Sequence, residues 1–546
     1  MKGRLLPSLP SRRWLLLGII ALELVGSAIV LHWLLASETG EGRAVAAVPR
    51  PTSSPTVVSL APSLPESMAA SIMAWLHDRA EPWLPGSEGA GLAVDWQSAR
   101  GARPVAEMFL VPAVPLASPR EDLAFDDVRR AWHGEAAGRF LVPDTAVAAL
   151  DSILGPRAAQ AAVEIVPAGE LVSRLEQQPE ATAILPFDEL QPRLKPLSVD
   201  GLFILDRGLD EARWPLRAVV WAGGPAGWEE ELAAALEQRG VDSNRHLHRL
   251  TVLAMTGVTA MARGVALEIE ARGDPGWPAR GLAGLLSAAD LTHVSNEVSF
   301  MPGCQASAES PAFCSSPEYM EVLRLVGADV VELTGNHNLD FGGTYALQSL
   351  DLYAEEGVAT FGGGRDAAAA SQPLIVTHNG NRLAFLGYNQ FGPDYALAGP
   401  ASPGAASFSL AAVQAGVVEA RRQADLVFVN VQYTEAYQAE PLPEQVADFR
   451  AIADAGADVV TGSQAHQPQH VELHGGKPIF YGLGNLFFDQ TWSPATRQSL
   501  IVRHYVYQGR LLSVEILPTT MDGDYQPTLA EGQERDEILR TVLPMR

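Results

Sequence analysis

The longest apolar run in the chain lies near its start, where residues 14–36 read WLLLGIIALELVGSAIVLHWLLA. Two ionisable residues, Glu23 and His32, interrupt this run, and residues 1–13 carry a basic flank. About 20 apolar residues suffice to cross a bilayer as a helix, and a basic flank stays in the cytoplasm. The pattern predicts a cytoplasmic flank over residues 1–13, a transmembrane anchor over residues 14–36 and a linker over residues 37–56.

A cleaved signal peptide is the alternative, because AVA at residues 44–46 has the small residues of a cleavage site. The apolar run is longer than the roughly 7–15 residues of a usual signal core, which favours the anchor. In either case the bulk of the protein works outside the cytoplasm. We therefore expect a single-pass protein of the cell membrane whose bulk is extracytoplasmic.

Residues 57–224 alternate short apolar runs with longer amphipathic stretches. Runs such as AEMFLVPAV, ATAILPF and LRAVVWA have the length of buried strands, whereas PESMAASIMAWLHDRA has the length of a helix. This alternation predicts a smaller α/β domain with helices on the faces of its sheet.

Residues 249–518 follow a more regular pattern, in which each buried run ends at once in a polar turn. Examples are LTHVSNEVSF, GADVVELTGNHN, ADLVFVNVQYTE and GADVVTGSQAH, with helical stretches such as SPEYMEVLRLVGA between them. In α/β proteins ligands bind at the carboxyl ends of strands, so these turns form the candidate site of a second α/β domain. The tail, residues 519–546, predicts one short amphipathic helix.

Composition narrows the partners. The 64 acidic residues outnumber the 39 basic ones, and the formal charge is −25. This balance excludes nucleic acid, whose phosphates need a basic surface, and disfavours a polyanion unless cations or a local basic patch intervene. The two cysteines, Cys304 and Cys314, lie close together in a loop-like segment. In an oxidising compartment they predict a disulfide, and two incidental thiols are the alternative.

Two polar turns contain the residues with the clearest chemistry. TGNHNLDFG, at residues 334–342, carries an Asn-His pair, and GSQAHQPQH, at residues 462–470, carries two histidines and three glutamines. An Asn-His pair can give a metal an amide oxygen while the imidazole serves as the acid for a leaving group. A lone pair of this kind is usually a loop cap. Here Glu297, His337 and His466 all follow strands of one predicted domain, which favours a joint site.

These segments resemble the CapA family, the poly-gamma-glutamate capsule synthesis proteins of the calcineurin-like metallophosphoesterase superfamily. TGNHNLDFG is similar to the family element GNHxxDxG, and GSQAHQPQHVELHGGKPIFYGLGNLFFDQ is similar to GxHPH…KPIFYSLGNFVFD. The resemblance covers the whole second domain in order. It implies a fold of class α/β, a four-layer metallophosphoesterase-like sandwich of two mixed sheets with helices outside.

The chain departs from the family pattern at several metal-binding positions. Val258 stands where the first strand usually ends in an aspartate, and a valine cannot bind a metal. Gln432 replaces a histidine, and Gln464 replaces the first histidine of the HPH element. Glutamine is a weak neutral ligand, so each replacement lowers the affinity for a transition metal.

The resemblance nevertheless implies roles for the residues that remain. The implied metal ligands are Glu297, Asn336 and His466, the catalytic groups are His337 and Glu435, and the pocket residues are Gln432, Gln464 and Asp340. A two-metal centre is hard to hold with this set. One divalent cation of unknown identity, for example Mg²⁺ or Ca²⁺, could still use the carboxylate and amide oxygens.

Two hypotheses follow from the resemblance. The first is a membrane-anchored protein of envelope-polymer synthesis or export, of poly-gamma-glutamate type, with a reduced metal-dependent hydrolase site. The second is a non-catalytic extracytoplasmic component that binds a polymer, a peptide or a lipid-linked sugar. Under either, the partners are the membrane and an envelope polymer or other polyanion. Metal content and phosphodiester hydrolysis of the purified protein discriminate them.

The first domain carries a resemblance of its own. FDDVRRAWHG, at residues 125–134, is similar to a helix followed by W-x-G in phosphate-type periplasmic solute-binding domains. ILPFDELQPRLKPLSVDG, at residues 184–201, is similar to the segment that returns to the first lobe in that fold. A generic accessory α/β domain is the alternative.

Overall fold

The computed structural model describes residues 55–79, 81–86, 91–135 and 138–544. By its internal contacts the chain divides into two units, residues 1–56 with 80–82 and residues 57–79 with 83–546. The predicted anchor over residues 14–36 lies outside the described residues. Within the described part, no helix is both long and apolar enough to cross a membrane.

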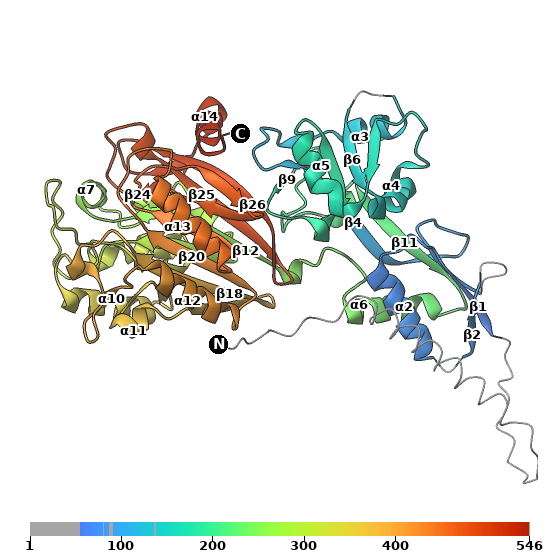
Figure 1. The fold of residues 1–546 in the computed structure, drawn as a ribbon, viewed down its shortest axis with the longest axis horizontal. Helices are drawn as coiled ribbons and strands as arrows, with labels where there is room; N and C mark the ends of the chain where they lie inside the picture. The colour runs from blue at the N-terminus through green and yellow to red at the C-terminus, as the bar shows by residue number, and fades with distance from the viewer. Residues whose placement is uncertain (1–54, 80, 87–90, 136–137, 545–546) are drawn as a thin grey trace, which may run out of the picture. The chain divides into compact units, whose positions relative to one another are not determined.

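Residues 56–223 form a nine-stranded mixed sheet in the order β2-β1-β3-β11-β4-β8-β6-β7, with β9 paired to β4 (Figure 1). Its strands are β1 (Thr56–Leu60), β2 (Trp83–Pro85), β3 (Leu92–Asp95), β4 (Arg103–Pro115), β6 (Phe140–Pro143), β7 (Val163–Val166), β8 (Thr182–Pro186), β9 (Leu194–Pro196) and β11 (Arg217–Gly223), and β5 (Asp122–Leu123) pairs separately with β10 (Ser198–Val199).

The helices of this region are α2 (Glu66–His77), α3 (Phe125–Trp132), α4 (Val147–Leu154), α5 (Leu171–Gln177) and α6 (Trp228–Arg239). The long strand β4 connects the two parts of the sheet, because it pairs antiparallel with β11 on one side and with β8 and β9 on the other. Seven consecutive residues of β4, from Met108 to Val114, are buried. The predicted alternation of strands and helices is confirmed here.

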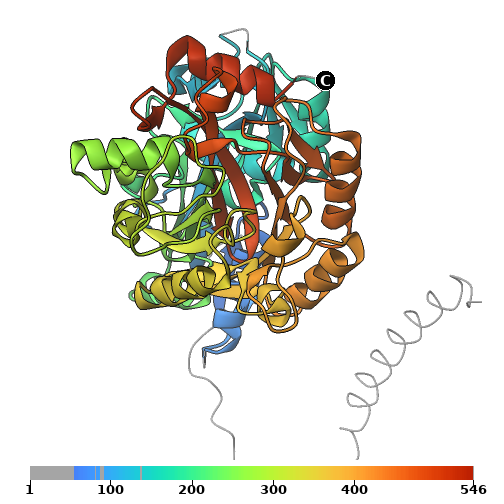
Figure 2. The ribbon, with the colours of Figure 1, turned by 90° about the vertical axis from the view of Figure 1, so that its left-hand side faces the viewer.

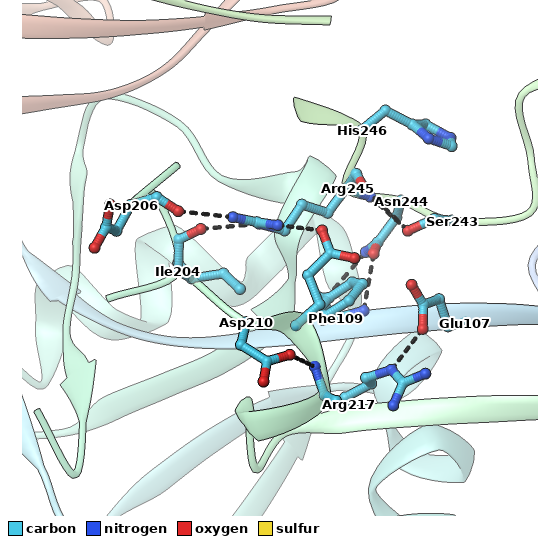
Figure 3. Close-up of polar contacts among 12 residues, drawn as sticks. Glu107, Phe109, Ile204, Asp206, Asp210, Arg217, Ser243, Asn244, Arg245 and His246 are labelled. Carbon is cyan, nitrogen blue, oxygen red and sulfur yellow. Dashed lines mark hydrogen bonds and ion pairs between the residues drawn. The ribbon is translucent and has the colours of Figure 1, made fainter. Parts of the chain in front are cut away.

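A buried arginine, Arg245, lies in the chain segment that follows this sheet (Figure 3). The side chain of Arg245 is 1% exposed and pairs with the carboxylate of Glu211. It donates to the carbonyl oxygens of Ile204 at 2.9 Å and of Asp206 at 3.0 Å. Its guanidinium carbon also lies 5.8 Å from the centroid of the Phe109 ring. A buried charge needs such pairing, so Arg245 fixes the loop around residues 204–211.

The second half of the chain contains two main sheets. The first has eight strands in the order β15-β14-β13-β12-β25-β26-β27, with β24 paired to β12. Its strands are β12 (Leu250–Thr259), β13 (Leu291–Asn296), β14 (Ala328–Glu332), β15 (Ala359–Phe361), β24 (Asn485–Phe487), β25 (Gln498–Tyr507), β26 (Arg510–Met521) and β27 (Pro527–Leu529). The strands β12 to β15 are parallel, and β25 joins them antiparallel.

The second sheet has six strands in the order β17-β18-β20-β21-β23-β22. Its strands are β17 (Leu374–His378), β18 (Asn381–Asn389), β20 (Leu426–Gln432), β21 (Val459–Ser463), β22 (Val471–His474) and β23 (Lys477–Phe480). The strands β18, β20, β21 and β23 are parallel, so the carboxyl ends of these strands share one edge. A small separate pair joins β16 (Gly363–Gly364) to β19 (Gly404–Ala405).

Helices lie on the outer sides of these two sheets (Figure 2). Three large apolar cores pack the described part of this half, beside a smaller cluster around Val258. One core takes side chains from both sheets, including Met255 of β12 and Phe428 of β20. The second lies between the first sheet and the helices α7 (Arg263–Arg272), α9 (Met320–Leu325) and α10 (Gly343–Glu355). The third lies between the second sheet and the helices α12 (Leu410–Arg421) and α13 (Pro443–Asp454). Short helices complete the half, α8 (Ala283–Leu286) and α11 (Ala367–Ala370). The predicted α/β class is thereby confirmed.

Two smaller predictions are also tested by the structure. Cys304 and Cys314 form a disulfide with their Cα atoms 5.9 Å apart, as the sequence predicts. The tail contains the expected amphipathic helix as α14 (Gly532–Val542), which buries Ile538 and Val542. The first sheet, however, continues past residue 518, because β26 runs to Met521 and pairs with β27.

Candidate functional site

The predicted site residues lie at the carboxyl ends of strands from both large sheets. From the first sheet, Glu297 follows β13 directly, and Asn336 and His337 follow β14. From the second sheet, Gln432 is the last residue of β20, and His466 comes three residues after β21. The loops of the two sheets therefore supply one group of polar side chains, as their order in the sequence predicts.

A close backbone approach brings two of these loops together. A Cβ atom on Gly335 would lie 2.1 Å from the Cβ atom of Glu297, so no larger residue fits there without movement. One residue after Glu297 and two residues after Gly335, Val298 and His337 form a parallel bridge. Glycine at this position therefore sets the distance between Glu297 and the Asn-His pair.

An amide bridge joins the two sheets at the centre of the site. Nε2 of Gln432 donates hydrogen bonds to Oδ1 of Asn336 and to Oε1 of Gln464, each at 2.7 Å. All three side chains are buried. Gln464 adopts a left-handed backbone with φ of 78°. The glutamine that replaces a family histidine thus binds the oxygen of Asn336, the atom that a metal would need.

His337 belongs to a charged pair. Its Nδ1 atom lies 2.7 Å from Oδ2 of Asp340, whose side chain is 3% exposed. The same carboxylate accepts the N–H of Phe313 at 2.8 Å and the hydroxyl of Tyr395 at 3.3 Å. Burial alone lowers the pKa of His337, but the hydrogen bond to Asp340 and the negative charges of Glu297 and Asp340 outweigh it, so the net shift is upward.

Glu297 is the carboxylate of the site whose charged form its surroundings favour least. It is buried, and its Oε1 atom has no hydrogen-bond partner in the described part of the chain. Burial raises the pKa of Glu297 to about 7, while the positive charges of His337 and Arg263 oppose that rise. A buried carboxylate with an unpaired oxygen is an incomplete ligand set, which a cation or a hydrogen-bond donor would complete.

Arg263 is a site residue that the sequence interpretation did not identify. It follows β12 with a left-handed φ of 47°, and its guanidinium pairs with the carboxylate of Asp489. The guanidinium carbon lies 4.4 Å from the centroid of the Phe313 ring. Its charge acts on the pKa values of Glu297, His337 and His466. In the sequence only its position points to it, because Arg263 lies five residues after Val258 and just beyond the end of β12.

His466 has a neutral environment. Its Nδ1 donates to Oδ1 of Asn485 at 2.9 Å, and burial lowers its pKa against that hydrogen bond. The ring of Tyr437 stacks on it, with the ring centroids 5.8 Å apart. Glu435, the second predicted catalytic residue, is exposed and accepts the hydroxyl of Tyr437. Glu435 is near enough for its charge to raise the pKa of His466 and of Glu297.

This donor set does not fit a two-metal centre. Within the described ranges, no three side chains of His, Cys, Asp or Glu are grouped as around a metal ion. The oxygen of Asn336 is engaged by Gln432, and Val258 is buried among apolar side chains. The unpaired oxygen of Glu297 remains as a single anionic donor.

The fold and the site define an α/β domain whose polar centre is built from the strand ends of two sheets. Residues 252–490 match the family described as bacterial capsule synthesis protein PGA_cap. This segment of the chain belongs to the CapA family.

Two curated relatives share this segment. The capsule biosynthesis protein CapA of Bacillus anthracis is 26% identical over 229 residues, which are 41% of this chain and 56% of that protein. The PGA biosynthesis protein CapA of Bacillus subtilis (strain 168) is 26% identical over 230 residues, 42% of this chain and 60% of that protein. The chain thus spans less than two thirds of either relative.

Among solved structures, an ABC-type phosphate transport receptor from Vibrio cholerae covers 33% of this chain and 93% of its own length. The sequence identity is 11% and the TM-score is 0.28. At that TM-score the match does not establish a common fold, so the solute-binding resemblance of the first domain stays a prediction.

Proposed function

We propose that the protein acts in the synthesis or export of an envelope polymer of poly-gamma-glutamate type. The match of residues 252–490 to the capsule synthesis family and the names of the two Bacillus relatives support this role. In this proposal residues 14–36 anchor the chain in the membrane, and the domains after residue 56 act outside the cytoplasm. The domain over residues 249–518 is a metallophosphoesterase-like sandwich with a reduced site.

The observation that carries the proposal is the polar centre itself, which gathers side chains from the strand ends of both sheets. Glu297, Asn336 and His337 come from the first sheet, and Gln432 and His466 come from the second. Such a group at the carboxyl ends of strands is the arrangement of a ligand site in an α/β protein.

In the hydrolase form of the proposal, Glu297, Asn336 and His466 would hold one divalent cation, which would supply Lewis-acid chemistry for a phosphoryl oxygen. His337, whose pKa is raised by Asp340, would donate a proton from Nε2 to a leaving group, since its Nδ1 faces the carboxylate. Glu435 is the nearby exposed carboxylate that can accept a proton.

The amide bridge favours a second candidate, in which the site binds the polymer, a peptide or a lipid-linked sugar without catalysis. Gln432 occupies the oxygen atoms of Asn336 and Gln464, so both would have to be released before either could bind a cation. The cost of breaking each buried hydrogen bond is about 1–3 kcal/mol. Weak cation binding and the absence of the family's first-strand aspartate both favour the non-catalytic binding form.

Elemental analysis and hydrolysis of bis(p-nitrophenyl) phosphate by the full-length purified protein test the two forms. In the hydrolase form, Glu297→Ala abolishes metal content and turnover, and Gln464→His raises both by restoring an imidazole. Val258→Asp adds a second carboxylate and, with added metal, raises both further. If all three variants match the parent in metal content and turnover, the hydrolase form is wrong and the binding form stands.

Deletion of the gene, followed by complementation, tests the role that both forms share. We expect the extracellular polymer to fall on deletion and to return with the parent gene. Gly335→Val, which drives a side chain into Glu297, should fail to restore it, whereas Gly284→Ala, where a Cβ meets nothing within 4 Å, should restore it. Unchanged polymer after deletion would contradict the proposed function.

A further inference from the structure

Exposed aromatic side chains gather around the polar centre. The structure describes nine exposed large hydrophobic residues, and the five aromatic ones are Phe341, Phe391, Tyr395, Tyr437 and Trp492. They lie in the loops that follow β14, β18, β20 and β24, the strands whose carboxyl ends supply or flank the site. Soluble proteins rarely expose several large aromatic side chains in one place without a binding partner.

These exposed rings continue inward as an unbroken series of ring contacts, here called the aromatic arc. The arc consists of Trp492, Tyr437, His466, Phe488, Phe313 and His337. The successive ring centroids along it are 5.8, 5.8, 5.2, 6.3 and 3.9 Å apart. At the His337 end, the hydroxyl of Tyr395 reaches the arc through Asp340. Trp492, at 63% exposed, is one end of the arc, and Tyr395, at 60% exposed, lies just beyond the other end.

Amide side chains accompany the arc. Gln490 donates to the hydroxyl of Tyr437 at 3.3 Å, and Gln390 accepts the hydroxyl of Thr434 at 3.3 Å. Behind them lies the amide bridge of Gln432. Each amide offers both a donor and an acceptor without a net charge. Rings for stacking and amides for hydrogen bonding are together the groups that suit a neutral, hydroxyl-rich ligand.

The charges at the site disfavour an anionic ligand. The basic side chains of Arg263 and His337 already pair with the carboxylates of Asp489 and Asp340. Glu435 adds an exposed negative charge beside Tyr437, and the whole chain carries a formal charge of −25. A polyanion would meet repulsion here, whereas the C–H faces of a neutral pyranose ring can stack on tyrosine and tryptophan.

We propose that the exposed rings around the polar centre, those of Trp492, Tyr437 and Tyr395, bind a neutral saccharide chain by stacking. The inner rings of the arc are buried and pack behind the exposed ones. The inference rests on the binding form of the proposed function, because it names the ligand class of the same site.

Calorimetric titration of the full-length protein in detergent tests the inference, with cellohexaose and chitohexaose as probes. We expect both hexasaccharides to bind more tightly than glucose or N-acetylglucosamine. Trp492→Ala and Tyr395→Ala should each weaken binding about 3- to 10-fold, the value of one aromatic stacking contact. Val418→Ala is the matched control, because Val418 is 48% exposed on α12 and lies outside the arc, and it should leave binding unchanged.

The inference is wrong if neither hexasaccharide binds at 10 mM, a limit of about 3 kcal/mol of binding free energy. It is also wrong if both bind but neither Trp492→Ala nor Tyr395→Ala weakens them. Competition by a poly-gamma-glutamate oligomer for the same site would replace the saccharide by an anionic ligand and leave the proposed function intact. Saccharide binding in a protein whose deletion leaves the polymer unchanged would instead contradict the proposed function alone.

Discussion

His337 and His466 lie in the same group of loops, but their hydrogen-bond partners differ in charge. The Nδ1 atom of His337 faces the carboxylate of Asp340, and the pKa of His337 is raised. The Nδ1 atom of His466 faces the amide of Asn485, and the pKa of His466 is lowered by burial. One site therefore shifts the pKa values of two imidazoles in opposite directions, because the charged partner of His337 outweighs burial and the amide partner of His466 does not.

The comparison shows that side chains of the site itself balance its charges. On the side of His337, every charged group has an opposite charge nearby, as in the Arg263–Asp489 and His337–Asp340 pairs. On the side of His466, the amides of Asn485, Gln432 and Gln464 carry the hydrogen bonds. On both sides most polar groups have partners, and the exceptions among the described residues include the buried oxygen Oε1 of Glu297.

The largest effect should come from giving His466 the kind of partner that His337 has. In Asn485→Asp the amide nitrogen is lost, although it donates to the carbonyl oxygens of His466 at 3.1 Å and Thr496 at 3.2 Å. The new buried carboxylate would face these acceptors. We expect a loss of about 3–5 kcal/mol in the free energy of unfolding, measured by urea denaturation at pH 7. Gln533→Glu, the same change of an exposed amide, should cost less than about 0.5 kcal/mol.

The reverse change removes the charge of the partner of His337. Asp340→Asn should cost about 2–3 kcal/mol, because a buried carboxylate that accepts from Phe313 and Tyr395 is lost. The folded pKa of His337 is raised, so its contribution is present below the unfolded value and is lost as the pH rises through the folded value. The cost should therefore be greater at pH 5.5 than at pH 8.5. An equal cost at both pH values would contradict the charged state of His337.

The smallest effect should have the opposite sign. Burial raises the pKa of Glu297 to about 7, so the folded protein loses stability as the pH rises through that value. Glu297→Gln removes the buried charge and should stabilise the protein by about 1–2 kcal/mol at pH 8.5, with little change at pH 5. The melting temperatures of parent and variant at the two pH values measure this. A variant less stable than the parent at pH 8.5 would show that Glu297 is paired.

Much of this site could be predicted from the sequence, because local patterns encode it. The buried runs of β13, β14, β20 and β21 are followed directly by polar turns, and parallel strands must bring such turns to one edge. That rule places Glu297, His337 and His466 at strand ends, and the family resemblance implies that the strand ends of the two sheets meet. The disulfide could be predicted because the chain has only two cysteines and they lie close together in the sequence.

The contacts that complete the site could not be predicted in this way, because they join residues far apart in sequence. Arg263 pairs with Asp489, 226 positions away, and Gln432 reaches Asn336 across 96 positions. The left-handed backbone of Arg263 also falls on a residue type that does not favour it. The opposite pKa shifts of the two histidines depend on burial and on the partners Asp340 and Asn485, and neither partner is distinguishable from an ordinary loop residue by pattern.

The disulfide links the maturation of the protein to its function. Cys314 follows Phe313, and the ring of Phe313 lies 3.9 Å from that of His337 and 4.4 Å from the guanidinium carbon of Arg263. The covalent tie to Cys304 thus holds the segment that brings this ring into place. A reduced chain lacks that tie, so packing alone would hold the ring of Phe313 beside His337 and Arg263. Formation of the disulfide therefore completes the site, and the redox state of the chain's surroundings would control its assembly.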